Sequence, residues 1–114
     1  MATIDSHLIR QELKAICATS NALNAQVKLM LEQLETDPSS FDELDTVDGE
    51  ISRDFPKVTL RKIYLTSNPQ NFRVIAAHWE ELDHVDLILA FPRGKGYHID
   101  WAWLAKILSD RDPS

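Results

Sequence analysis

Apolar side chains recur at alternating steps of three and four residues between Leu8 and Leu34, which is the spacing of one face of an α-helix. Ser20 is the one polar residue that occupies a position of this stripe. The apolar members are Ile9, Leu13, Ile16, Leu23, Val27, Met30 and Leu34. The pattern predicts that residues 6–36 are helical.

A single straight helix over residues 6–36 would be about 45 Å long at about 1.5 Å per residue. A chain of this length folds to a radius of gyration of about 13 Å. Thr19, Ser20 and Asn21 are weak helix formers at the midpoint of the stripe, so we favour a two-helix hairpin that breaks there. The unbroken stripe keeps one long helix open as the alternative. The same stripe also allows a helical-hairpin protein that forms a homodimer through residues 9–34.

After Pro56 the hydrophobic period changes from that of a helix to that of a strand. The runs 58–65, 72–79 and 85–91 are rich in β-branched and aromatic residues and are separated by turn-forming segments. We therefore predict an antiparallel meander over residues 57–91. No strand is predicted before Leu8.

For the C-terminal residues 92–110 we predict a loop followed by a helix. Asp100 can cap this helix, which carries Trp101, Leu104 and Leu108 on one side. The whole chain, residues 1–114, is then one α+β domain: an N-terminal helical hairpin packed on one face of a three-stranded or slightly larger antiparallel sheet, with a C-terminal helix. In this arrangement the other face of the sheet is free for function.

The charge is divided unevenly along the chain. The net charge is −6, but residues 1–56 carry eleven acids against four bases, whereas residues 57–114 carry seven acids against eight bases. Much of the acidity lies in residues 37–56, which we predict to be a loop. This acidic loop is either a solvated segment or a shield over the basic strands, since residues 57–79 contain bases and no acid.

Several classes of protein are excluded by what the sequence lacks. The single cysteine, Cys17, excludes an intramolecular disulfide, and no Cys/His pairs have the spacing of a structural zinc site. No apolar run approaches the length of a membrane span, and the N-terminus does not resemble a secretion signal, so we expect a cytoplasmic protein without a membrane partner. Phosphate-loop, serine-hydrolase and metalloprotease motifs are missing, and we predict neither a cofactor nor a metal.

The candidate chemistry lies in basic and proton-transferring side chains on the predicted strands and just after them. These are Arg61, Lys62, Tyr64 and Arg73 on the strands and Arg93, Lys95, Tyr97 and His98 after the last strand. Guanidinium groups bind a phosphodiester and stabilise the charge of its transition state, while tyrosine, lysine or histidine moves protons. The alternative is that each base is an ordinary solvated strand residue. His78 and His84 flank a charged turn and are interpreted as surface or edge residues.

From about Leu13 to Leu108 the chain resembles the RelE/ParE-like toxins of bacterial toxin-antitoxin modules. The resemblance lies in five segments, 31–38, 60–65, 71–75, 85–90 and 105–108, which read LEQLETDP, LRKIYL, NFRVI, VDLILA and AKIL. Members of this family begin with a strand that pairs into the sheet and are typically basic, whereas this chain has a sequence pI of about 5.1.

The resemblance implies a toxin-like protein that an antitoxin neutralises, and a ribosome-dependent endoribonuclease that cuts messenger RNA without a metal. Arg73 and Arg93 would then hold the phosphate and Tyr97 or His98 would transfer the proton, as catalytic residues. Arg61, Lys62 and Lys95 would bind the RNA backbone.

Two alternatives stay open beside this hypothesis. The resemblance also covers ParE-like proteins, which inhibit DNA gyrase. A non-catalytic protein-binding module that kept the fold is favoured by the acidity of the chain and by its aromatic last helix.

Overall fold

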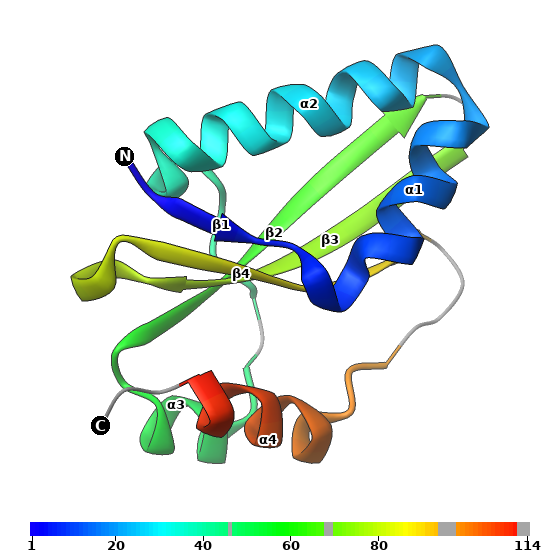
Figure 1. The fold of residues 1–114 in the computed structure, drawn as a ribbon. Helices are drawn as coiled ribbons and strands as arrows, with labels where there is room; N and C mark the ends of the chain where they lie inside the picture. Colours follow the sequence, from blue (N-terminus) through cyan, green and yellow to red (C-terminus); the bar gives the residue numbers. More distant parts are fainter. Residues whose placement is uncertain (46, 68–69, 94–97, 112–114) are drawn as a thin grey trace.

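The computed structural model describes residues 1–45, 47–67, 70–93 and 98–111, and Figure 1 shows a sheet with helices on both of its faces. The described residues form strands β1 (Thr3–Asp5), β2 (Val58–Ser67), β3 (Gln70–Trp79) and β4 (His84–Pro92), and helices α1 (Arg10–Thr19), α2 (Asn21–Thr36), α3 (Gly49–Asp54) and α4 (Trp101–Arg111). Short 3-10 helices lie at His7–Ile9, Pro38–Ser40 and Glu80–Leu82. The predicted mixed α+β class is confirmed.

The helical hairpin breaks at Ser20, as predicted. The backbone of Ser20 is extended, and its side-chain oxygen accepts a hydrogen bond from the backbone N–H of Leu23 at 3.1 Å, which caps the start of α2. At its other end α2 stops at Thr36, just before Pro38. Among the described helices, none combines the length and apolarity that crossing a lipid bilayer requires.

The three strands after Pro56 form the predicted antiparallel meander, and the order across the sheet is β1-β4-β3-β2. β2 and β3 pair without interruption from Val58 opposite Trp79 to Ser67 opposite Gln70. Between β3 and β4 the register shifts next to Ile75, and Ile88 is the extra residue of a β-bulge.

Strand β1 corrects the prediction that no strand precedes Leu8. Thr3 and Asp5 lie opposite His84 and Asp86, and the two strands run parallel, so the sheet is mixed rather than purely antiparallel. A segment of three residues is too short to display a period of two, and for this reason the sequence pattern did not reveal it.

Each face of the sheet is covered by a separate group of helices (Figure 1). On one face, α1 and α2 pack on Ile63, Leu65, Val74, Ala76, Val85 and Leu87. On the other, α3 and α4 supply Ile51, Leu104 and Leu108, which pack on Leu60, Ala77, Trp79 and Ile88. The prediction of a free second face is therefore wrong over this half of the sheet, because its apolar side chains need a cover of their own.

The acidic segment 37–56 is more ordered than the predicted loop. Gly49–Asp54 form α3, whose first turn is capped by the Asp48 carboxylate accepting from the Glu50 N–H at 2.9 Å. Before α3, the chain lies along the edge strand β2, because the Leu44 N–H donates to the Leu60 carbonyl and the Lys62 N–H donates to the Asp42 carbonyl. This segment therefore covers part of the exposed edge of the sheet.

Candidate functional site

A group of cationic side chains gathers around Tyr64, towards the end of the β2–β3 pair at which Ser67 lies opposite Gln70. We call Lys62, Tyr64, Arg73 and Arg93 the Tyr64 cluster. Tyr64 lies directly opposite Arg73 in the β2–β3 pair, so the two side chains share a face of the sheet. Arg73 Nη2 donates to the Tyr64 hydroxyl at 2.8 Å.

Both arginines of this cluster contact the tyrosine ring. The guanidinium carbons of Arg73 and Arg93 lie 5.0 and 4.2 Å from the centre of the Tyr64 ring, within the range of a cation–π interaction. The backbone N–H of Arg93 donates to the Asn71 carbonyl at 2.9 Å, which fixes this residue beside β3. Two of the predicted catalytic residues, Arg73 and Arg93, are thus brought together by one aromatic side chain.

The Tyr64 cluster retains hydrogen-bonding capacity. Tyr64 is 40% exposed, and Arg93 is exposed as well. The Nε atom of Arg73 is buried and has no hydrogen-bond partner among the described residues. Buried donors are nearly always paired, so this N–H is an exception, and a ligand oxygen would reach it only if the side chains that cover it moved.

Lys62 belongs to the same face, but an acid already compensates its charge. Its Nζ lies 2.7 Å from Asp45 Oδ2, a carboxylate of the acidic segment. This hydrogen bond raises the pKa of Lys62 and lowers the pKa of Asp45. Of the two interpretations of the acidic segment, this contact favours the one in which it shields a basic strand.

Arg61 does not join the Tyr64 cluster, although it was predicted to bind RNA. It lies on the opposite face of β2 and is only 5% exposed. Its guanidinium donates to His78 Nδ1 at 3.1 Å, to the Phe41 carbonyl at 2.9 Å and to Glu80 at 3.3 Å. The guanidinium of Arg61 is therefore hydrogen-bonded inside the protein, and this residue is not part of the surface around Tyr64.

His78, the acceptor of that hydrogen bond, corrects the interpretation of this histidine as a surface or edge residue. Its side chain is buried. Burial, together with the positive charge of Arg61, lowers the pKa of His78, which keeps the ring neutral and able to accept.

The remaining predicted site residues are not placed at the cluster. Lys95 and Tyr97 lie outside the described residues. His98 is exposed in the segment before α4, and no hydrogen bond or ion pair joins it to another described residue. The proposed proton-transfer role of Tyr97 or His98 therefore stays a prediction.

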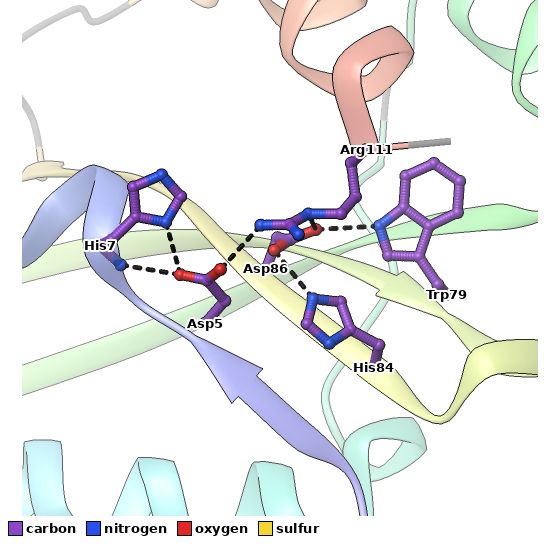
Figure 2. Close-up of polar contacts among 6 residues, drawn as sticks. All are labelled: Asp5, His7, Trp79, His84, Asp86 and Arg111. Atoms are coloured by element: carbon purple, nitrogen blue, oxygen red, sulfur yellow. Dashed lines mark hydrogen bonds and ion pairs between the residues drawn. The ribbon is translucent and has the colours of Figure 1, made fainter. Parts of the chain in front are cut away.

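A second polar group, which the sequence did not suggest, lies at the other end of β3. We call Asp5, His7, Trp79, His84, Asp86 and Arg111 the Asp86 cluster (Figure 2). Asp86 is buried at 3% exposure, and its carboxylate accepts from Trp79 Nε1 at 3.1 Å and lies 3.0 Å from both His84 Nε2 and Arg111 Nε. Arg111, from the end of α4, also reaches Asp5 Oδ2 at 2.7 Å.

Asp5 extends this network to the start of the chain. Its carboxylate accepts from the backbone N–H of His7 at 3.0 Å, and the His7 ring nitrogen Nδ1 lies 2.6 Å away. These contacts with His7, supported by the charge of Arg111, lower the pKa of Asp5 to about 2. A pocket of about 310 Å³ adjoins the cluster and is lined by His7, Leu8, Asp86, Ile107, Asp110 and Arg111.

One member of the Asp86 cluster has a signal in the sequence. Asp86 is the one charged residue in an otherwise apolar strand, and a charge at such a position needs an internal partner. His84 was interpreted as a surface or edge residue, yet its side chain is 17% exposed and bonded to Asp86. Asp5 and Arg111 gave no local signal, because each contributes through contacts that are distant in sequence.

The two clusters can perform different chemistry. The Tyr64 cluster offers guanidinium donors and an aromatic ring, which suit a phosphodiester. The Asp86 cluster offers carboxylates and imidazoles, which suit a cation. The chain matches no family model, and a search of the curated proteins finds no significant match.

Proposed function

We propose that the protein binds RNA through the Tyr64 cluster and acts as a toxin-like component of a toxin-antitoxin module. The observation that carries the proposal is that Arg73 and Arg93, which are far apart in sequence, both lie against the exposed ring of Tyr64. Two guanidinium groups on one aromatic side chain form a surface that can bind a phosphate and stack a base.

The reaction that the resemblance implies is metal-independent cleavage of RNA. The 2′-hydroxyl would attack the neighbouring phosphorus and form a 2′,3′-cyclic phosphate, while the bond to the 5′-oxygen of the next nucleotide breaks and that oxygen leaves as a protonated 5′-hydroxyl. Arg73 and Arg93 would stabilise the additional negative charge. Tyr97 or His98 would accept or donate the proton that this reaction moves. An antitoxin would block the same surface, and ribosome-bound messenger RNA would be the substrate.

Two features support the proposal beyond the arginine pair. The chain begins with β1, which pairs into the sheet, as members of the RelE/ParE-like family do. Arg73 also carries an unpaired buried N–H at the cluster. The acidic segment works against polyanion binding at Lys62, so we expect affinity to depend mainly on the two arginines.

Binding to a labelled single-stranded RNA, measured by fluorescence anisotropy over a range of salt concentrations, tests the binding step. We expect affinity to fall steeply with salt, and Arg73→Ala and Arg93→Ala each to weaken it about tenfold and to reduce the log–log salt slope by about 0.7. Arg10→Ala, an exposed arginine on α1, is the matched control and should leave binding unchanged. Equal binding by all four proteins would exclude the Tyr64 cluster.

Growth arrest on expression in bacteria tests the toxin activity. The wild-type chain should arrest growth, and Arg73→Ala should abolish the arrest while folding normally by circular dichroism. RNA binding without arrest would support a binding module instead of a toxin. Arrest that persists in Arg73→Ala would contradict the proposed catalytic role of this residue.

A further inference from the structure

We propose that Asp5, His84 and Asp86 form a binding site for a divalent transition-metal ion, with Zn²⁺ as the representative, and that the Arg111 guanidinium takes the place of that ion in the metal-free protein. This site lies at the opposite end of β3 from the Tyr64 cluster, so the inference does not depend on the proposed RNA binding.

The backbone places the three ligands together on one face of the sheet. Asp5 and Asp86 lie opposite each other in the parallel β1–β4 pair, and His84 precedes Asp86 by two residues on the same strand. Each residue offers one ligand atom, and these three atoms all lie within 4.8 Å of one another. Ligand atoms that surround an ion at about 2.0–2.2 Å are about 3–4 Å apart, so small side-chain movements would complete the coordination.

The donor set and its surroundings suit Zn²⁺ better than Mg²⁺. The imidazole of His84 is a borderline ligand that suits Zn²⁺, and Zn²⁺ also accepts carboxylate oxygens, whereas Mg²⁺ prefers an all-oxygen shell with retained water. The Trp79 indole N–H already orients the Asp86 carboxylate, and the His7 backbone N–H orients that of Asp5. Hydrogen bonds of this kind hold metal ligands in place in established sites.

Arg111 occupies the position between the two carboxylates. Its Nη2 lies 2.7 Å from Asp5 Oδ2 and its Nε lies 3.0 Å from Asp86 Oδ2, so one guanidinium bridges the pair (Figure 2). A divalent ion at the same position would compete with this guanidinium for both oxygens. The Arg111 side chain is 37% exposed at the end of α4, so it can leave the carboxylates without unpacking the core.

The adjoining pocket reaches one of the three proposed ligands, Asp86. Its volume of about 310 Å³ holds several water molecules, and Asp86 and Arg111 form part of its wall. His7 and Asp110 also line it, which supplies a further imidazole and a further carboxylate close to the proposed position. An ion bound there would keep coordination positions open to solvent, as catalytic rather than structural zinc sites do.

Titration of the full-length, metal-free chain with Zn²⁺ alone, followed by calorimetry, tests the site. Co²⁺ is the second probe, because its visible absorption reports the ligand geometry. We expect one ion per chain, and a loss of affinity of about 100-fold or more in Asp5→Asn and in His84→Gln. His98→Gln, an exposed histidine outside the cluster, is the matched control and should bind like the wild type.

Arg111→Gln is the decisive variant, because it separates a metal site from a purely structural ion-pair network. Removing the competing guanidinium should tighten Zn²⁺ binding about tenfold and increase the rise in melting temperature that Zn²⁺ produces. Mg²⁺ should produce neither effect. The proposal is overturned if neither the wild type nor Arg111→Gln binds Zn²⁺ at millimolar concentration, or if His84→Gln binds it as tightly as the wild type.

Discussion

The two ends of strand β3 carry polar clusters on the same face of the sheet, and they differ in how their charges are compensated. At one end, Arg73 and Arg93 contact an aromatic ring that is 40% exposed, and Asp45 of the acidic segment pairs with Lys62. At the other end, Asp86 is 3% exposed and is surrounded by partners of opposite or neutral character.

This difference follows from the cover that each end receives. Helix α4 packs over the Trp79 end of β3 and brings Arg111 with it, so charges there are withdrawn from water and must be paired. At the Arg73 end water still reaches the side chains, and cations can stay uncompensated at small cost. In the metal-free protein the Asp86 cluster therefore stabilises the fold through paired charges, and the Tyr64 cluster is the better surface for binding an anion.

The largest effect that this comparison predicts is for Asp86→Ala. The substitution leaves the Trp79 N–H and part of the Arg111 guanidinium without their buried acceptor, and we expect a loss of about 3 kcal/mol in the free energy of unfolding. Urea denaturation measures it. Asp45→Asn, at an exposed acid that also pairs with a cation, is the control and should leave the midpoint of urea denaturation nearly unchanged. Similar losses in the two variants would contradict the division into a buried and an exposed cluster.

The next effect concerns acid stability. The pKa of Asp5 is about 2 in the folded protein against an ordinary value of 3.8, so the folded state binds this proton less readily than the unfolded state. Its contribution is complete above the unfolded value and is lost as the pH falls from about 4 towards about 2.

Denaturation midpoints measured between pH 6 and pH 2 check this prediction, with Asp5→Asn as the comparison. The variant should be less stable at neutral pH and should show a shallower decline in acid, since it has no carboxylate to protonate. Parallel pH profiles for the two proteins would show that Asp5 is not a source of acid sensitivity.

A smaller effect is expected when the ring of the Tyr64 cluster is removed. Tyr64→Ala takes away the surface on which both arginines lie, and RNA affinity should fall about fivefold to tenfold. Tyr64→Phe keeps the ring and loses only the hydroxyl that accepts from Arg73, so we expect a change of about twofold. Anisotropy at constant salt distinguishes them. Equal losses would assign the effect to the hydroxyl rather than the ring.

The smallest effect concerns the acidic segment. Asp45→Asn removes the carboxylate that raises the pKa of Lys62, and it frees the ammonium for a phosphate. RNA affinity at low salt should rise about threefold, and the gain should disappear near 0.5 M salt because the interaction is exposed and screened. Weaker binding by this variant would show that Asp45 positions Lys62 rather than masking it.

The sequence by itself determined that residues 6–36 are helical and that three antiparallel strands follow Pro56, and it favoured a break near Ser20 over one long helix. These features arise from local causes: a period of 3.6 or 2, a capping side chain and turn-forming residues. That Tyr64 and Arg73 lie on the same face of the sheet could also be predicted from local features. Side-chain alternation and a short connection restrict the register of β2 against β3.

Only the tertiary structure decided the pairing of β1, the cover over the second face and the composition of the Asp86 cluster. Asp5, Asp86 and Arg111 meet because a short parallel strand and the last helix dock on β4 and β3, and neither event has a signature in neighbouring residues. The role of Arg61 was also decided by the tertiary structure. Its guanidinium donates to the Phe41 carbonyl and to His78, which come from other segments, so it is not available to a ligand. Local patterns decide which elements form, whereas contacts between distant segments decide which charges remain available.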